Sequence, residues 1–436
     1  MIRAYPLHPS VSPGGTLTLC VSSPTPRWRV EFVRQGATPQ TAGEARFADA
    51  RAVPDGPPDA DWDWPRHAFR VPDDWPSGPY LARLHADAAD APPGECLFVV
   101  RGHVDRPAPI LYKLPLFTWH AYAETSPGAS LYTGGRRVTL RRPGGGTGAT
   151  PWDADVPDAH DRGSPRQVFA HWDAPFCAWL ARAGYAVDFC TDLDVHEDPA
   201  LLARHRLLLS VGHDEYWSEP LRAHVERFVD AGGHAAFFSA NTCWWRVHLD
   251  ADGTAFSCDR RPADPARPDG PAADMWHATR SEAALTGVSY RHGGGWWSGE
   301  RPALGFTVRV ADHWVFAGTG LREGDQFGAA ERLVGYECDG CKLQRTPDGG
   351  VRVRHDEGTP PDFEPLALAW LGPGWEDLKT DGPAAATLGL HVRPGGGTVF
   401  TAATVDWARV LAAGRVAAVE RITRNVLDRL GAPPSR

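Results

Sequence analysis

Lysine and cysteine are scarce in this chain of 436 residues. Only three lysines occur, at positions 113, 342 and 379, so nearly all basic charge is arginine, and the formal net charge is −9. An acidic balance of this size argues against nucleic acid or an anionic membrane as a partner. The eight cysteines are too few and too scattered for a disulfide scaffold, and buried free thiols are expected instead.

The sequence also lacks a long hydrophobic run. No apolar segment is long enough to span a bilayer, and residues 1–6 contain no apolar core of a signal peptide. We therefore expect a soluble cytoplasmic protein that acts on a small-molecule substrate, with no nucleic-acid or membrane partner. The sequence leaves a homo-oligomer open.

Tryptophan, by contrast, is abundant. The chain has 18 tryptophans, and pairs such as Trp244 with Trp245 and Trp296 with Trp297 lie close to glycines or turns. Indole rings of this kind either wall a binding site or fill the core of β-rich segments, the second being the commoner role.

The N-terminal part reads as an all-β module. Short strands are expected at residues 16–21, 28–33, 77–84 and 95–100, separated by turns rich in Pro, Gly and Asp. This pattern predicts an immunoglobulin-like β-sandwich over residues 1–105. No residue in it suggests catalysis.

From residue 106 onward the pattern changes to alternating strands and helices. Apolar strands are expected at residues 186–190, 207–211 and 235–238, with amphipathic helices between them and a closing helix near residues 416–430. This alternation predicts an α/β domain over residues 106–436, built on a largely parallel sheet flanked by helices. A β-rich insertion is expected at about residues 247–395.

Titratable side chains directly follow the strand at residues 207–211. His213, Asp214 and Glu215 occupy the strand-to-helix loop, where open α/β sheets place their ligands. Such groups transfer protons, bind a metal or hold a substrate amide. The alternative is a loop that only caps the helix at Ser218, with Glu215 favoured by the helix dipole.

Two cysteine patterns suggest other chemistry. Cys243 follows the next strand and could form a nucleophilic pair with His213, although the glycine-flanked nucleophile elbow is missing. Cys338 and Cys341 have the spacing of half a zinc site, but no second pair follows at finger spacing. A structural thiol and a tight turn explain these two patterns equally well.

Two further segments, residues 116–124 and 130–135, bring phenols to loop tips. Tyr122 and Tyr132 either cap the sheet or reach the crevice that contains Glu215.

Taken together, these motifs resemble the large (β) subunit of N,N-dimethylformamidase and the proteins named after its C-terminal region. The likeness runs from about residue 110 to the end. It rests on residues 119–122, 130–132, 212–218, 239–242, 313–321, 335–339 and 422–425.

The resemblance implies a class I glutamine-amidotransferase-like α/β core. It also implies an amidohydrolase that acts on a C–N bond of a small amide-like substrate with the help of Fe(III). The ferric ion would be held by two tyrosinates and a glutamate, here Tyr122, Tyr132 and Glu215, with Tyr216 as the rival for the second tyrosine. Such hard oxygen donors suit Fe(III), which polarises a carbonyl or lowers the pKa of bound water.

The leading hypothesis, an enzyme that acts on a C–N bond of a small amide-like substrate, assigns the remaining roles. His213 would move protons with Asp214 and Glu215 beside it, and Asn241 would orient the substrate. The predicted substrate-binding residues are Trp119, Trp217 and Trp245.

Two other functions remain open on the sequence. The first is a metal-independent group-transfer or condensation enzyme that uses His213, Asp214 and Glu215 as acid and base. The second is a non-catalytic protein that binds carbohydrate or another ligand through its Trp-rich loops and sandwich.

Overall fold

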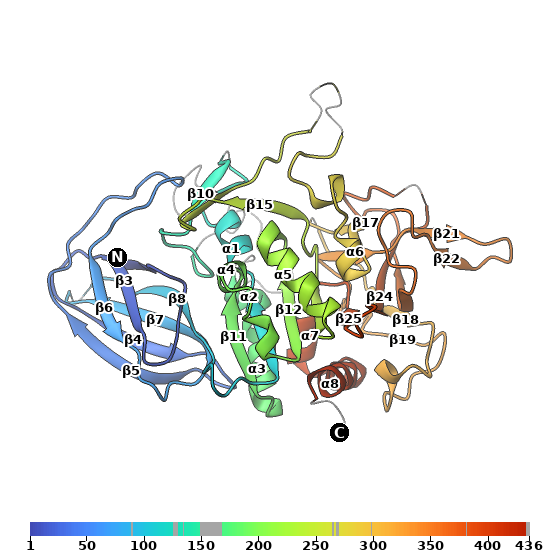
Figure 1. Cartoon of the computed structure of the whole chain (residues 1–436), viewed down its shortest axis with the longest axis horizontal. Helices are drawn as coiled ribbons and strands as arrows, with labels where there is room; N and C mark the ends of the chain where they lie inside the picture. The colour runs from blue at the N-terminus through green and yellow to red at the C-terminus, as the bar shows by residue number, and fades with distance from the viewer. Residues whose placement is uncertain are drawn as a thin grey trace. The chain divides into compact units, whose positions relative to one another are not determined.

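The computed structural model describes residues 1–432 except 89, 125–129, 134, 149–167, 264–265, 267–269, 298 and 381. The chain forms two compact units. The first contains Met1–Pro199 and Val247–Cys258, and the second contains Ala200–Arg246 and Asp259–Arg436. Figure 1 shows the helices and strands of both units, coloured along the chain.

The first unit begins with two sheets whose strands pair mostly antiparallel. One has the strand order β2-β8-β7-β4-β5 and the other the order β1-β3-β6. Their bounds are β1 (Arg3–Pro6), β2 (Ser10–Val11), β3 (Thr16–Ser22), β4 (Trp28–Arg34), β5 (Gln40–Phe47), β6 (Arg66–Arg70), β7 (Gly78–Ala86) and β8 (Gly94–Val100).

Alternation of side chains along these strands builds one core. In β4, Trp28, Val30 and Phe32 are buried, and they share a hydrophobic cluster with Leu19 of β3 and Tyr80 of β7. Because successive side chains of a strand point to opposite faces, the intervening polar residues face outward. The four strands predicted in this region are confirmed to within a residue or two at each end.

The rest of the first unit combines short strands with helices. β9 (Ile110–Leu114) pairs in parallel with β11 (Val187–Thr191), and β16 (Ala255–Ser257) pairs antiparallel with β10 (Arg137–Thr139) and β15 (Trp245–Leu249). The helices are α1 (Leu116–Tyr122), α2 (Phe169–Trp172), α3 (Ala174–Ala183) and α4 (Asp192–Glu197).

A buried ion pair fixes the start of α1. Lys113 Nζ lies 2.5 Å from Asp192 Oδ1, and both side chains are fully buried. Asp192 Oδ2 also accepts the backbone N–H of Phe117 at 3.0 Å, which satisfies one of the unpaired donors of the first helical turn. These contacts therefore set the direction of the helix that ends at Tyr122.

The second unit is built on a mixed sheet with the strand order β12-β14-β25-β24-β23-β18-β19. β14 pairs in parallel with β12 and with β25, whereas β24, β23, β18 and β19 continue the sheet antiparallel. The bounds are β12 (Leu207–His213), β14 (His234–Ala240), β18 (Phe306–Val308), β19 (Gln326–Phe327), β23 (Glu364–Trp370), β24 (Ala385–Val392) and β25 (Thr398–Thr401).

The other elements of this unit lie around the sheet, and α7 and α8 pack against β12 and β14. Helical segments are η1 (Leu202–Arg204), α5 (Glu219–Asp230), η2 (Trp276–Ala278), α6 (Ala283–Thr286), η3 (Trp314–Phe316), α7 (Trp407–Ala413) and α8 (Ala417–Gly431). Remaining strands are β13 (Tyr216–Ser218), β17 (Ser289–Gly295), β20 (Glu337–Gly340), β21 (Leu343–Arg345) and β22 (Val351–Val353).

The predicted fold class is wrong. The regular secondary structure of the described residues is mostly β-strand, in several mixed sheets, with only 19% helix, and it does not form the predicted α/β protein with a class I glutamine-amidotransferase-like parallel core. The region predicted as a separate insertion, about residues 247–395, supplies β18, β23 and β24 to the same sheet as β14. An apolar run shows that a strand is buried, but it does not show which neighbour the strand pairs with.

The predicted boundary near residue 105 and the predicted insertion stay predictions. Within the described residues, no helix combines the length and the apolar composition that crossing a bilayer requires.

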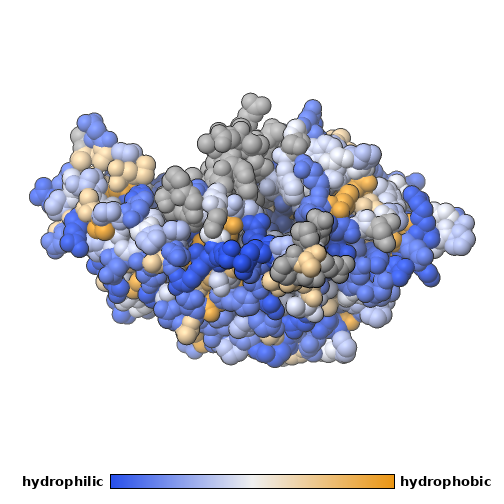
Figure 2. All heavy atoms as spheres, turned by 90° about the horizontal axis from the view of Figure 1, so that it is seen from above, coloured by the Kyte–Doolittle hydropathy of each residue, from blue (hydrophilic) through white to orange (hydrophobic). Residues whose placement is uncertain are grey.

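Hydrophilic residues predominate on the face drawn in Figure 2, where hydrophobic residues are scattered.

Candidate active site

The central group of the site is His213, the last residue of β12. Gly212, immediately before it, has a φ of 68°, a left-handed conformation that glycine adopts readily. Asp214 and Glu215 follow directly, and all three residues are at most 3% exposed. The predicted strand-to-loop step at this position is confirmed, although only two residues separate β12 from β13.

A glutamate from another strand faces this histidine. Glu337, the first residue of β20, places Oε2 2.9 Å from His213 Nε2, and Glu215 Oε2 lies 3.7 Å from the same nitrogen. Asn241, directly after β14, has its Nδ2 3.3 Å from Glu337 Oε2 and 3.3 Å from His213 Nε2. Four polar side chains from three strand ends therefore meet in a buried cluster.

The charges around His213 keep its imidazole protonated. Burial lowers the pKa of His213, but the carboxylates of Glu337, Glu215 and Asp214 outweigh it and raise the pKa to about 9. An imidazolium among carboxylates is both a proton donor and a positive centre for a developing anion.

A second carboxylate on β20 shapes the turn that carries Asn241. Asp339 accepts the backbone N–H of Asn241 at 2.8 Å and that of Thr242 at 3.4 Å. Asn241 and Cys243 have φ values of 50° and 57°, in the left-handed region. Burial raises the pKa of Asp339 to about 8, although the Asn241 N–H opposes this effect.

An indole ring completes the surroundings of Glu337. Trp297 Nε1 donates to Glu337 Oε1 at 3.1 Å, while the residue as a whole is 37% exposed. Gly295 pairs with Glu337 across β17 and β20, and a Cβ on Gly295 would lie 2.3 Å from the indole nitrogen. The glycine therefore lets the tryptophan fold back over the glutamate.

Asp214 supports the loop. Its carboxylate accepts hydrogen bonds from Ser210 Oγ at 2.6 Å and from Trp217 Nε1 at 3.0 Å. Trp217 is fully buried and packs against Phe237. Both side chains therefore act on the shape of the loop, and the catalytic and substrate-binding roles expected for them stay predictions.

Trp245 also lies beside the loop. Its backbone N–H donates to Glu215 O at 2.9 Å, and the Arg260 guanidinium lies 5.0 Å from the centre of its ring. Trp245 as a whole is 7% exposed, so the substrate-binding role expected for it stays a prediction.

The cysteine alternatives gain no support from the structure. All eight cysteines are free and buried. Burial raises the pKa of Cys243, which disfavours the thiolate that a nucleophile needs. Among the described residues, no group of three or more His, Cys, Asp and Glu side chains is arranged to hold a metal ion.

The predicted tyrosine ligands form a pair in the first unit. Tyr132 Oη donates to Tyr122 Oη at 2.6 Å, and the two rings stack with centroids 4.2 Å apart. The segment is anchored to α1, because Leu131 N donates to Ala121 O at 3.0 Å. Sequence reasoning selected these two phenols, and the structure brings them together.

The C-terminal end of α1 is held by a buried arginine. Arg142 donates to His120 O at 3.0 Å and to Ala123 O at 3.2 Å. Trp119, the substrate-binding candidate on the same helix, is 2% exposed and lies edge-on to Phe169. Its Nε1 has no hydrogen-bond partner in the part of the chain that the structure describes.

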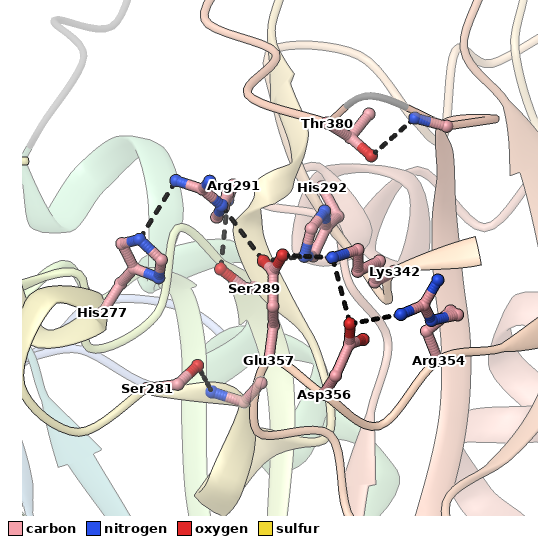
Figure 3. Close-up of polar contacts among 12 residues, drawn as sticks. His277, Ser281, Ser289, Arg291, His292, Lys342, Arg354, Asp356, Glu357 and Thr380 are labelled. Atoms are coloured by element: carbon pink, nitrogen blue, oxygen red, sulfur yellow. Dashed lines mark hydrogen bonds and ion pairs between the residues drawn. The ribbon is translucent and has the colours of Figure 1, made fainter. Parts of the chain in front are cut away.

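A separate polar cluster lies farther along β17. Glu357 accepts hydrogen bonds from Arg291 Nε at 3.1 Å and from Lys342 Nζ at 2.5 Å (Figure 3). Its Oε2 also lies 3.0 Å from His292 Nε2. These opposite charges neutralise one another and anchor the segment after β22 to β17. We therefore assign this cluster a structural role.

Sequence reasoning missed Glu337, Asp339 and Trp297. A signal for the two carboxylates was present, because residues 335–339 are among the motifs that carry the family resemblance. Nothing in the sequence shows, however, that residue 337 faces residue 213.

A buried imidazolium between carboxylates is chemically able to transfer protons. A family model described as N,N-dimethylformamidase beta subunit-like, C-terminal, matches residues 28–421. The chain therefore belongs to this family, and the predicted resemblance is confirmed. The match also extends farther towards the N-terminus than residue 110. A search of curated proteins found no match.

Proposed function

We propose that this chain hydrolyses the C–N bond of a small amide and that His213 and Glu337 move the protons. The observation that carries this proposal is the 2.9 Å contact between His213 Nε2 and Glu337 Oε2 in a buried cluster. Membership of the N,N-dimethylformamidase beta subunit-like family supports an amide as the substrate class.

Hydrolysis of an amide needs a base for the attacking water and an acid for the leaving nitrogen. Glu337 is the proposed base, because a carboxylate oxygen with a free lone pair can take a proton from water. The water oxygen bonds to the carbonyl carbon, and the electron pair of the carbonyl moves to its oxygen. His213, as imidazolium, stabilises the negative charge that forms there.

The contact between His213 and Glu337 also determines when the second proton is transferred. Once Glu337 has taken the proton from water, it is neutral and no longer raises the pKa of His213. The imidazolium then becomes a stronger acid and gives its proton to the nitrogen as the C–N bond breaks. The products are a carboxylic acid and an amine, and the proton on Glu337 returns His213 to its starting state.

Fe(III), which the family resemblance implies, fits the phenol pair of the first unit. The hydroxyl oxygens of Tyr122 and Tyr132 are 2.6 Å apart, so a single cation can contact both. These two residues would hold the ion, and Glu215 stays the predicted third ligand. When bound, Fe(III) would polarise an amide carbonyl or lower the pKa of a bound water.

The test is an assay of the purified chain with small amides, in which amine and carboxylate are measured by proton NMR. We expect both products in equal amounts, and a loss of roughly 100-fold or more in kcat for His213→Gln. His85→Gln, a change in the N-terminal strand β7, is the matched control and should leave the rate unchanged. Failure to release either product from any amide, or full activity in His213→Gln, would contradict the proposal.

A further inference from the structure

A cavity of about 500 Å³ lies in the first unit, at the end of the sheet where β4 begins and where β5 and β7 end (Figure 1). Its volume falls within the roughly 300–1,000 Å³ of small-molecule sites. Residues 27–29, 46–47 and 85–87 form its wall, and none of them belongs to the His213–Glu337 cluster. The cavity is therefore a candidate for a second site.

Two arginines of this wall oppose each other on neighbouring strands. Arg29 of β4 is directly opposite Arg46 of β5 in the antiparallel register, and like charges in this position destabilise a sheet. In the part of the chain that the structure describes, neither guanidinium has an ion pair or a side-chain hydrogen bond. The pair therefore lacks a counter-charge that would offset its repulsion.

The remaining charges of the wall only partly compensate. The third arginine, Arg27, places Nε 3.0 Å from Asp87 Oδ2. Asp87 is the one carboxylate among the described residues of the wall, so three arginines and one aspartate leave two positive charges. The next pair along the same strand faces, Glu31 and Glu44, does not line the cavity.

His85 adds no charge to the wall. It lies opposite Arg29 on the other neighbouring strand, β7. Burial, and after it the charge of Arg29, lowers the pKa of His85 below its ordinary value. The imidazole is therefore neutral at pH 7.

Aromatic side chains form the apolar part of the wall. Phe47 stacks on Trp28 with ring centroids 4.6 Å apart. Trp28 Nε1 is buried and has no hydrogen-bond partner among the described residues. A buried N–H without an acceptor costs free energy, and the oxygen of an anion in the cavity would supply the acceptor.

We propose that this cavity binds a small organic dianion, a molecule with two oxyanion groups on a ring-sized apolar body. Arg29 and Arg46 pair with the two anionic groups, since guanidinium forms strong charge-assisted hydrogen bonds with such oxygens. The Trp28 N–H contacts one of these oxygens, and Phe47 packs against the apolar body. The two negative charges of the ligand match the two positive charges of the wall. This binding does not depend on the proposed function.

Three ligands of known chemistry test the proposal by isothermal titration calorimetry of the full chain. Phthalate has a ring and two carboxylates, sulfate has two charges without the ring, and 1,2-benzenedimethanol has the ring without charge. We expect phthalate to bind roughly tenfold or more tightly than either, with an affinity that falls as salt is added. Sulfate binding as tight as that of phthalate would mean an adventitious ion only, and this result or no binding of phthalate would overturn the proposal.

Two variants assign the binding to its residues. Arg29→Gln and Arg46→Gln should each weaken phthalate binding roughly tenfold or more, the range of a hydrogen bond to a charged group. Each should also leave the free energy of unfolding unchanged or raise it, because the repulsion between the two arginines is removed.

Arg70→Gln is the matched control. Arg70 is exposed on β6, in the other sheet of the same unit, and its loss removes the same charge outside the cavity. It should change neither the affinity for phthalate nor the stability. Phthalate binding that persists in full in Arg29→Gln and Arg46→Gln, or that weakens equally in Arg70→Gln, would overturn the proposal.

Discussion

His213 Nε2 lies 2.9 Å from Glu337 Oε2, and both side chains are buried. The contact joins the end of β12 to the start of β20, two strands that are far apart in the sequence. It gives the site an imidazolium with an adjacent base, and the proposed function depends on this pair.

Glu337→Gln should reduce kcat by roughly 10²- to 10⁴-fold, the usual contribution of a general base. Glutamine has the same shape and can still accept from Trp297, so the fold should persist. The measurement is the rate of amine release at saturating amide. Glu323→Gln, at an exposed position, is the control, and activity in Glu337→Gln equal to that of this control would exclude Glu337 as the base.

The raised pKa of His213 predicts how stability depends on pH. Its pKa is about 9 in the folded chain, against an ordinary value near 6.5, so the stabilisation is fully present below pH 6.5. As the pH rises to about 9, this stabilisation is lost, which corresponds to roughly 3 kcal/mol in the free energy of unfolding.

His213→Gln should remove that part of the decrease, and urea unfolding across this pH window measures it. Asp339, whose pKa is raised to about 8, contributes in the same direction in both proteins, so the difference isolates His213. If the free energy of unfolding fell equally with pH in the natural chain and in His213→Gln, that result would be inconsistent with a raised pKa of His213.

Gly295→Ala should displace Trp297 from Glu337. A Cβ at this position would lie 2.3 Å from the indole nitrogen, well inside contact distance. We expect a loss of about 1–3 kcal/mol in stability, together with a shift in tryptophan fluorescence and a lower kcat. Gly372→Ala, where a Cβ meets nothing within 4 Å, is the control, and an identical response of both variants would contradict the assignment.

Tyr132→Phe tests the iron proposal without disturbing the stacked rings. Phenylalanine keeps the ring that packs at 4.2 Å on Tyr122 but removes one of the two oxygens. We expect the iron content, measured by mass spectrometry, and the phenolate-to-iron absorption to fall together. Tyr185→Phe, which keeps its ring contact with Trp179, should leave both unchanged. Iron retained in full by Tyr132→Phe would exclude Tyr132 as a ligand.

Ser218→Ala should lower the free energy of unfolding by about 1 kcal/mol. The Ser218 side chain caps α5 by accepting the backbone N–H of Leu221 at 3.3 Å. Urea unfolding measures the change. A stability equal to that of the natural chain would show that this cap is not needed.

Local features of the fold could be predicted from the sequence. The strand that became β4 and the apolar run before His213 both appear where expected. These features depend on residues close together in the chain, whose periodicity and turn chemistry are visible in the sequence.

Pairing between distant strands could not be predicted. The run in β24 is nearly as buried as that in β12, yet β24 pairs antiparallel with both of its neighbours, and such pairing overturned the predicted fold class. The site shows the same division. His213 and Asn241 come at the ends of apolar strands and were selected, whereas Glu337 lies on β20, which pairs with β17.

The most direct test of the account is an NMR titration of the His213 imidazole, in the natural chain and in Glu337→Gln. We expect a pKa of about 9 in the natural chain and a clearly lower value in the variant, because Glu337 is the nearest carboxylate. An ordinary pKa near 6.5 in the natural chain, or the same value in both proteins, would contradict the account.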